Sequence, residues 1–312
     1  MNLVFCGTPQ FAVPTLERLV LAGHSVHLVL TQPDRPKGRG LELVSSPVKQ
    51  SALKHGLPIY QPEKIKANEE LRAKLEAIHR DAIIVVGYGR IIPKWMLDLP
   101  RYGNINLHGS LLPKYRGAAP IQWAIASGEM GTGVTTMRID EDLDTGDILL
   151  QQELPIMPDD TSETVTPRLA EIGAELMIET LRGLATDSIS PRKQDHAQAT
   201  LAPIFNKEDG RIDFSRSAKK IYNRFRGFQP WPGAFTSFRG RSMNVTAMKP
   251  ISEGIVDLAP AELAVRDGRL IAGCADETVI ELLEVQPEGK KKIAARDFIH
   301  GYRLQAGEKL GA

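Results

Sequence analysis

Short apolar segments alternate with longer amphipathic segments through the first two-thirds of the sequence. Residues 3–6 and 81–86 are rich in the aliphatic side chains of buried strands. Between them, residues 11–22 and 68–80 have the pattern of amphipathic helices. Consecutive parallel strands need a crossover connection, which is usually a helix. The alternation therefore predicts an α/β fold built on a doubly wound, mostly parallel, Rossmann-like sheet.

The pattern changes after residues 183–206. That stretch mixes Ser, Pro, Ala and Gln with charged residues and shows no clear periodicity. Beyond it come one helical pattern, at 218–226, and short alternating strands such as 243–248 and 279–283. Regular short strands separated by Gly-containing turns favour a small β-barrel or sandwich. We therefore expect a first domain over 1–188, a linker over 189–206 and a smaller domain over 207–312.

The composition limits the classes of protein that fit this pattern. The 312 residues suffice for about two domains of typical size. With 39 basic and 38 acidic side chains, the net charge of +1 excludes a uniformly basic nucleic-acid binder. Cys6 and Cys274 lie far apart and outside any CxxC motif, which favours a reducing compartment without disulfides. The sequence contains no apolar run of roughly 18 residues and no signal peptide, so we expect a cytoplasmic protein without a membrane partner.

The turn after the first strand, Gly7-Thr-Pro-Gln-Phe11, lies where a dinucleotide-binding fingerprint would be. It lacks GxGxxG, and Pro9 removes a backbone N–H that would face a pyrophosphate. The sequence also lacks the GxxxxGK[ST] loop of P-loop NTPases. A nicotinamide enzyme is therefore disfavoured, and a P-loop NTPase is excluded.

Three polar side chains alternate along the segment Asn104-Ile-Asn106-Leu-His108. Because side chains in a strand alternate with period two, Asn104, Asn106 and His108 share one face. One interpretation is a hydrogen-bonded polar layer within the core. The other is a ligand site, because open α/β sheets bind ligands at the carboxyl ends of their strands. In such a site an Asn amide donates to a developing oxyanion, and a His transfers a proton.

An acidic stretch covers residues 140–147, with Asp140, Asp142 and Asp144 at alternate positions. It resembles the start of an EF-hand loop, but Thr145 stands where that loop needs Gly and Gln151 where it needs Glu. We therefore reject a calcium site and expect no metal. The stretch is either a solvated acidic turn or the source of a carboxylate that orients a His.

Two basic regions are candidates for phosphate contacts. The connection at 33–40 contains two Pro and two Gly, which predicts a loop outside regular structure, and it carries Arg35, Lys37 and Arg39. Residues 204–250 hold ten basic and three acidic side chains. Either region is a solvated face or a surface for a phosphate backbone.

These motifs together resemble one family. Asn106, His108-Gly-Ser-Leu-Leu-Pro113 and Asp144-Thr-Gly-Asp147 are similar to the signature of the folate-dependent formyltransferases. The connection at 33–40 and the basic C-terminal domain are similar to the tRNA-dependent branch of that family. Further shared motifs are Gly7-Thr-Pro-Gln-Phe11, Arg116-Gly-Ala-Ala-Pro-Ile-Gln122, Asp160-Thr-Ser162 and Gln229-Pro-Trp-Pro232.

The resemblance implies transfer of a formyl group from 10-formyltetrahydrofolate to the α-amine of charged initiator methionyl-tRNA. It implies catalytic roles for Asn106, His108 and Asp144, and a C-terminal barrel of the oligonucleotide-binding (OB-like) type. The segment expected to bind folate comprises Ser110, Leu111, Leu112 and Pro113, with a pterin pocket lined mostly by the backbone of Val86, Gly87, Tyr88 and Gly89.

The expected tRNA contacts are basic side chains of the loop and of the second domain. They are Arg35, Lys37, Arg39, Lys207, Arg211, Lys219, Lys220 and Arg224. The sequence departs from the family at the linker, where Leu201 and Ile204 replace a common Tyr and Lys. We expect the protein to be a monomer whose partners are tRNA and folate.

Three alternatives stay open at this point. A formyltransferase that acts on a small amine, such as a nucleotide sugar, would need the same three catalytic residues but no basic loop or basic barrel. A 10-formyltetrahydrofolate hydrolase, in which water replaces the amine, would fit the same constellation. An RNA-binding module with a vestigial α/β domain would have no need of Asn106, His108 and Asp144.

Overall fold

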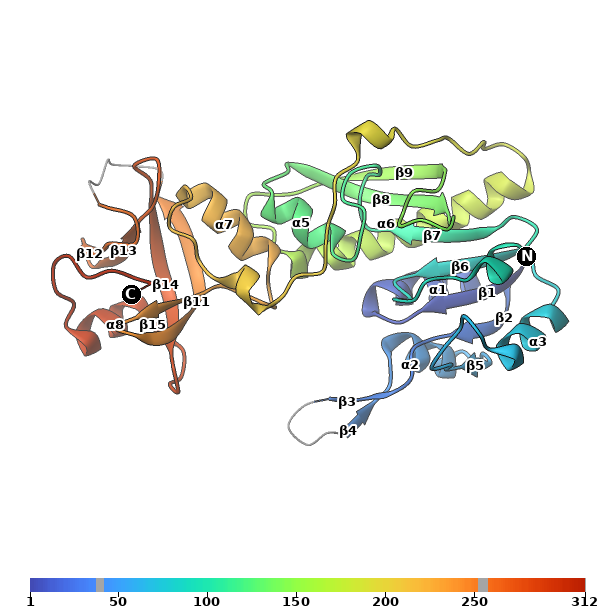
Figure 1. Ribbon diagram of the computed structural model, residues 1–312, viewed down its shortest axis with the longest axis horizontal. Helices are drawn as coiled ribbons and strands as arrows, with labels where there is room; N and C mark the ends of the chain where they lie inside the picture. The colour runs from blue at the N-terminus through green and yellow to red at the C-terminus, as the bar shows by residue number, and fades with distance from the viewer. Residues whose placement is uncertain (38–41, 252–257, 312) are drawn as a thin grey trace. The chain divides into compact units, whose positions relative to one another are not determined.

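The computed structural model describes residues 1–37, 42–251 and 258–311, and its contacts divide the chain into two compact units (Figure 1). The first unit comprises Met1–Pro120, Gly131–Pro155 and Thr164–Pro203. The second comprises Ile121–Met130, Ile156–Glu163 and the chain from Ile204 onward. Two short segments that interrupt the first unit therefore belong, by their contacts, to the second. The domain boundaries at 188 and 207 stay a prediction.

A seven-stranded sheet forms the centre of the first unit, in the order β5-β2-β1-β6-β7-β8-β9. The strands from β5 to β7 are parallel, whereas β8 and β9 are antiparallel to their neighbours. This arrangement confirms the mostly parallel Rossmann-like sheet. The bounds are β1 Asn2–Gly7, β2 Ser25–Leu30, β5 Ile59–Tyr60, β6 Ala82–Val86, β7 Asn104–His108, β8 Gly131–Arg138 and β9 Ile148–Pro155.

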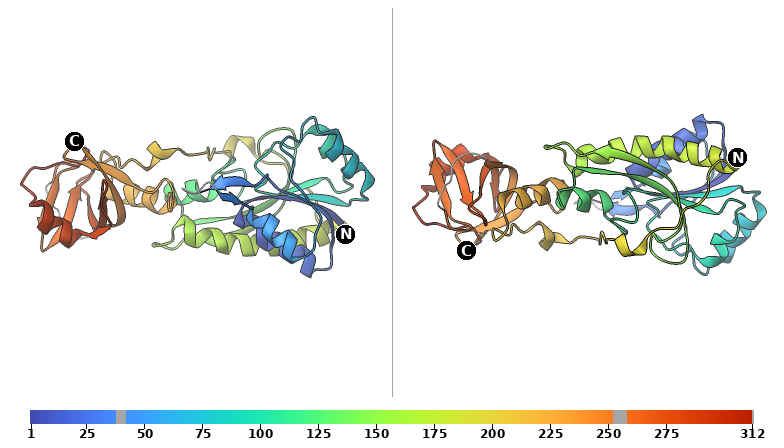
Figure 2. Two further views of the ribbon diagram at one scale, coloured as in Figure 1. Left: turned by 90° about the horizontal axis from the view of Figure 1, so that it is seen from below. Right: turned by 90° about the horizontal axis from the view of Figure 1, so that it is seen from above.

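Helices cover both faces of this sheet, as the turned views in Figure 2 show. On one face, α6 packs against β7, because Gly173 of α6 leaves room only for the side chain of Leu107. An ion pair between Arg18 and Glu175 joins α1 to α6. On the other face, Leu71 of α3 and Met96 of α4 complete a core with β1 and β6. The bounds are α1 Val13–Leu21, α2 Pro47–Lys54, α3 Glu69–Ala77, α4 Lys94–Leu97 and α6 Ser162–Ala185.

Local sequence signals explain where several helices begin. Asn68 caps α3, as predicted, because its side-chain oxygen accepts the backbone N–H of Leu71 at 2.8 Å. Ser46 caps α2 in the same way through Lys49, with Pro47 at the first helical position. The first helix starts later than expected, at Val13, since Gln10–Ala12 forms a short 3₁₀ turn (η1).

The connection after β2 contains regular structure, so the prediction that its prolines and glycines exclude it was wrong. β3 (Arg35–Lys37) pairs antiparallel with β4 (Glu42–Val44) as a small separate hairpin. Only alternate residues of a hairpin strand donate across the ladder, and both strands are edges, so Pro36 is tolerated. Arg39 lies outside the described residues.

The second unit holds a six-stranded antiparallel sheet in which β10, β11, β14, β13 and β12 follow one another and β15 pairs with β14. Residues 308–311 join its two outer strands. The backbone of Leu310 is hydrogen-bonded to Ala261 before β12, and that of Gly311 to Ser237 of β10. This closure confirms a small C-terminal barrel. The bounds are β10 Phe235–Phe238, β11 Arg241–Ile251, β12 Leu263–Arg266, β13 Arg269–Gly273, β14 Val279–Pro287 and β15 Ile293–Ala294.

Helices of the second unit fill and flank this barrel. Phe298 of α8 is fully buried against Phe238. Arg226 of α7 is also buried and donates to the backbone carbonyls of Met157 and Asp160, which ties the 156–163 segment to this unit. The bounds are α5 Pro120–Ala126, η3 Lys207–Gly210, α7 Ala218–Gly227 and α8 Ala295–Tyr302, and a further 3₁₀ turn of the first unit is η2 His196–Gln198.

The two cysteines are single buried thiols, one in each unit. Burial raises the pKa of Cys6 far above its usual value and that of Cys274 to about 12, so both thiols are protonated at neutral pH. Over the described residues, no helix is long and apolar enough to cross a membrane.

Candidate active site

Strand β7 places its three polar side chains on the face of the sheet that α4 covers. The Asn104 side chain stabilises the fold, because its amide donates to the carbonyls of Met96 and Leu97 at 3.0 and 3.1 Å. Asn106 is half-buried, and within the described part of the chain no hydrogen bond engages its amide. The polar-layer interpretation therefore holds for Asn104, whereas Asn106 remains available to a ligand.

His108 is the last residue of β7, and each of its ring nitrogens has a polar neighbour. Its Nε2 lies 2.9 Å from the backbone oxygen of Tyr115, and its Nδ1 lies 3.7 Å from Oδ2 of Asp144. A carbonyl oxygen only accepts hydrogen bonds, so Nε2 carries a proton. Nδ1 is then the nitrogen that can gain and lose a proton. Because 3.7 Å exceeds a hydrogen-bond length, Asp144 supports a positive imidazole by charge.

Asp144 lies in the connection between β8 and β9, in the left-handed backbone region with φ of 53°. Its Oδ2 accepts the backbone N–H of Gly117 at 2.9 Å. Two residues later, Gly146 packs so closely on β8 that an added Cβ would lie 1.9 Å from the oxygen of Arg138. The acidic stretch is therefore a fixed turn that presents one carboxylate to His108.

The segment expected to bind folate follows β7 directly and is held by hydrogen bonds from side chains of β8 and β9. The Thr135 hydroxyl donates to the Ser110 oxygen at 2.6 Å and accepts the N–H of Leu112 at 3.2 Å. The Gln151 amide donates to the Leu112 oxygen and to Thr135, both at 3.0 Å. Because Thr135 has no exposed surface, these contacts fix the backbone of 110–113.

On the expectation that residues 110–113 bind folate, the variant Thr135→Val should weaken folate use, because it removes one donor and one acceptor while it keeps the shape of the side chain. Each buried polar group left without a partner costs about 1–3 kcal/mol. We expect the KM for the folate donor to rise about tenfold, with a lower melting temperature. Steady-state kinetics and thermal unfolding measure both. Thr132→Val, in a buried threonine of the same strand, is the control, and an unchanged folate KM in Thr135→Val would contradict this role of Thr135.

The other expected folate contact, Val86 to Gly89, lies at the end of β6. Register pairs Val85 with Asn106, so this segment runs beside the end of β7. The Tyr88 side chain is buried in the core, and burial raises the pKa of its hydroxyl. Its backbone oxygen accepts Gln32 Nε2 at 3.0 Å. Gln32 Nε2 also donates to the Gly89 oxygen at 3.3 Å, and both Gly87 and Gly89 have positive φ.

The basic residues expected to contact tRNA have different environments. Arg35 is exposed on β3, and the backbone of Lys37 ends that strand. In the second unit, Lys207 and Arg211 both lie over the ring of Phe235, at 5.8 and 5.0 Å from its centroid. The exposed side chains are Arg35, Lys207, Arg211, Lys219 and Lys220.

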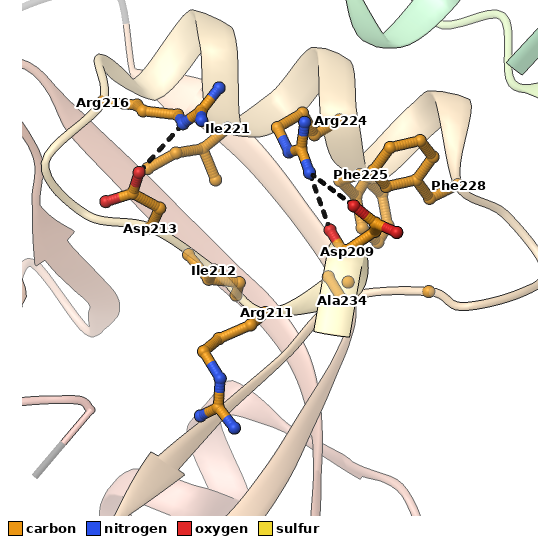
Figure 3. Close-up of a pocket in the computed structure, with 12 residues that line it drawn as sticks. Asp209, Arg211, Ile212, Asp213, Arg216, Ile221, Arg224, Phe225, Phe228 and Ala234 are labelled. Atoms are coloured by element: carbon orange, nitrogen blue, oxygen red, sulfur yellow. Dashed lines mark hydrogen bonds and ion pairs between the residues drawn. The ribbon is translucent and has the colours of Figure 1, made fainter. Parts of the chain in front are cut away.

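Arg224 is directed into the second unit instead of outward. Its guanidinium donates to the backbone oxygen of Asp209 at 2.9 Å and lies over the ring of Phe228 (Figure 3). Burial lowers its pKa from the usual arginine value. The same pocket holds an Arg216–Asp213 ion pair, so its charges are already paired. Arg224 supports the fold of this unit and has little surface left for RNA.

The sequence did not indicate the residues that hold the two turns around His108 and Asp144. Gln194 and Thr200 lie in the stretch expected to be a linker, yet Gln194 contacts Asp144 and the Thr200 hydroxyl accepts the N–H of Tyr115 at 2.8 Å. Arg116, known from the sequence only as part of a motif, is 7% exposed and donates to Gln194. No periodic pattern marked these positions, because an irregular segment held by side-chain hydrogen bonds has none.

Comparison with protein families settles the class. Residues 1–181 match the formyl transferase family, and residues 205–303 match the formyl transferase C-terminal domain. The chain belongs to the formyl transferase family. It is therefore an enzyme of the class that the sequence motifs indicated, and the vestigial-domain alternative is excluded.

Relatives of this formyl transferase match it along its whole length. It is 63% identical to the methionyl-tRNA formyltransferase of Koribacter versatilis and 62% identical to that of Acidobacterium capsulatum. Each match covers 100% of this chain, with 99% and 100% of the respective relative.

Solved structures of sugar formyltransferases share the fold. The sugar 3N-formyl transferase WlaRD, crystallised in the presence of dTDP and 5-N-formyl-THF, aligns with a TM-score of 0.67 over 93% of this chain and 99% of that chain. An N-formyltransferase from Helicobacter canadensis aligns with a TM-score of 0.66 over 91% of this chain and 98% of that chain. Both are 18% identical to this chain, so they establish the fold alone.

Proposed function

We propose that this enzyme transfers the formyl group of 10-formyltetrahydrofolate to the α-amine of charged initiator methionyl-tRNA. One observation carries the chemistry: the His108 imidazole stands between the Tyr115 carbonyl and the Asp144 carboxylate, with Asn106 beside it on the same strand face. The acceptor follows from the full-length relatives, which are methionyl-tRNA formyltransferases at 62–63% identity.

The proposed reaction needs an oxyanion stabiliser and a proton carrier. The α-amine attacks the formyl carbon, which becomes tetrahedral, and the formyl oxygen becomes an oxyanion. The free amide of Asn106 donates to that oxyanion. The attacking nitrogen loses a proton to Nδ1 of His108, whose positive charge Asp144 stabilises. The bond from carbon to the folate nitrogen then breaks, and that nitrogen takes the proton, which releases tetrahydrofolate and formyl-methionyl-tRNA.

One chain supplies both parts that this reaction requires. The His108 site belongs to the first unit, and the exposed basic side chains of Lys207, Arg211, Lys219 and Lys220 belong to the second. Such charges position a phosphate backbone without reading sequence. We therefore propose that a single copy is active, as a monomer, and that it acts in the cytoplasm, where charged tRNA enters translation.

A parallel assay tests the proposed acceptor. Formyl transfer from 10-formyltetrahydrofolate is measured with charged initiator methionyl-tRNA, charged elongator methionyl-tRNA and free methionine. Formylation of the initiator species alone is the expected result. Folate consumption without formyl-tRNA would point to hydrolysis, and formylation of a nucleotide amino sugar instead of tRNA would point to the small-amine alternative.

The paired variant Lys219→Ala/Lys220→Ala should weaken tRNA binding by charge alone. Both lysines are exposed on α7, and neither forms an ion pair within the described residues. Because each phosphate contact contributes about 0.7–0.9 to the salt slope of log K, the slope should fall by about 1.5. Binding isotherms over a salt series measure this.

The matched control for this pair is Lys64→Ala/Lys66→Ala, which removes two exposed lysines of the first unit that likewise form no ion pair within the described residues. The initiator-to-elongator preference should be unchanged in both pairs, since phosphate contacts carry no sequence information. An identical salt slope in wild type and the α7 pair would remove these lysines from the tRNA surface.

A further inference from the structure

Residues 192–202 contact the two turns that carry Tyr115 and Asp144. Arg192 pairs through its backbone with Ile148 at the start of β9, with both hydrogen bonds at 2.8 Å. Further along, the oxygen of Thr200 and the N–H of Ala202 are hydrogen-bonded to the backbone of Arg116 at 2.8 and 2.7 Å. Between these two anchors, the side chain of Gln194 turns inward and is only 5% exposed.

All hydrogen-bonding capacity of the Gln194 amide is used. Its Nε2 donates to the backbone oxygens of Asp144 and Gly146, at 2.9 and 2.8 Å. Its Oε1 accepts two hydrogen bonds from Arg116, from Nε at 3.1 Å and from Nη2 at 2.7 Å. Two carbonyls require donors and a guanidinium requires an acceptor, so the partners fix the orientation of the amide.

Arg116 also stands at the centre of the contacts that hold the His108–Asp144 pair. The residue before it, Tyr115, supplies the oxygen that binds His108, and the residue after it, Gly117, supplies the N–H that binds Asp144. The side chain of Arg116 reaches the backbone of Asp144 through Gln194. Residues 115–117 and Gln194 therefore enclose the pair from both sides.

We propose that Gln194, anchored by Arg116, is a positioning residue for Asp144. Asp144 adopts a left-handed backbone, which few L residues other than Asn and Asp adopt. The two donors of Gln194 hold the carbonyls of this turn, and so set the distance between the carboxylate and Nδ1 of His108. This inference rests on the proposed function, in which that carboxylate stabilises a positive His108.

The substitution Gln194→Glu separates positioning from packing. It keeps the shape of the side chain and gives Arg116 a charged partner, but it replaces the donor to both carbonyls with an oxygen. We expect kcat for formyl transfer to fall ten- to a hundredfold, with the KM for folate and for tRNA within about twofold of wild type. Gln305→Glu makes the same amide-to-carboxylate change at an exposed site and should stay at the wild-type rate.

A double variant shows whether the effect passes through Asp144. In the Asp144→Asn background, Gln194→Glu should lower the residual rate by less than twofold, because the carboxylate that it positions is already absent. Losses that multiply instead would assign Gln194 a structural role and overturn the proposal. The residual rate is followed in single-turnover formyl transfer.

Gln194→Asn covers the case in which Gln194→Glu does not fold. It keeps the amide and shortens the side chain by one methylene, so we expect a folded protein, by circular dichroism, with kcat reduced about tenfold. Wild-type kcat in this variant, or in folded Gln194→Glu, overturns the positioning role. Absence of formyl transfer in the wild-type enzyme would instead overturn the proposed function.

Discussion

Replacement of His108 with Ala is expected to lower turnover about a thousandfold, because general acid–base catalysis contributes about 10²–10⁴. The imidazole is 6% exposed and lies at the end of β7, and its Nδ1 faces the only carboxylate within ion-pair distance among the described contacts. Single-turnover formyl transfer measures the loss. Binding of tRNA and of folate should stay within about threefold, since neither depends on proton transfer.

The control for this variant is His79→Ala, which removes an exposed imidazole from the same unit. His108→Ala also leaves the Tyr115 oxygen without its donor, so the folded fraction is measured beside the rate. A folded His108→Ala enzyme with normal turnover would remove His108 from the chemistry. A folded variant that has lost tRNA binding as well would show that the imidazole shapes the acceptor site.

Deletion of residues 308–312 is expected to destabilise the second unit by roughly 5 kcal/mol, from the burial of one Leu and several backbone hydrogen bonds. Leu310 is 3% exposed in the barrel core. The backbone of 308–311 is hydrogen-bonded to Ala261, Leu263 and Ser237 at 2.8–2.9 Å. The ion pair between Arg239 and Glu308, which lowers the pKa of Glu308, is also lost.

Loss of the tail also exposes the edges of β10 and β12, and unpaired strand edges promote aggregation. Denaturant unfolding and light scattering measure the two effects. Gln305→Ala, at an exposed position just before the tail, should behave like wild type. Unfolding of the truncated protein at the wild-type denaturant midpoint would mean that the tail adds nothing to the closure of the barrel.

Much of the fold could be predicted from local patterns. The apolar runs at β1, β2, β6 and β7 are short, bounded by turn residues and separated by helices, so periodicity located them. The antiparallel direction of β8 and β9 was not predicted, because strand direction depends on the connections and not on the residues of the strand. The closure of the barrel by residues 308–311 was also beyond the sequence, since it uses backbone hydrogen bonds between distant positions.

The candidate site divides in the same way. Asn106, His108 and Asp144 could be predicted because strand alternation and a family signature mark them, and the structure places His108 against Asp144. Asn104 shares the alternation but serves the fold, a distinction that only its contacts with α4 reveal. Gln194 was invisible in the sequence, since its role comes from four hydrogen bonds to residues at least 48 positions away.

The two compact units do not correspond to two continuous stretches of the sequence. Residues 121–130 precede β8 and residues 156–163 follow β9, both strands of the first unit, yet the two segments group with the second unit. Within the second unit, Arg226 donates to the Asp160 oxygen and the Ser162 hydroxyl donates to the Gln229 oxygen. A recombination event near residue 205 would therefore separate residues 121–130 and 156–163 from the rest of the second unit and leave them with the first. Exchange of the C-terminal unit between relatives therefore requires that α5 and the start of α6 travel with it.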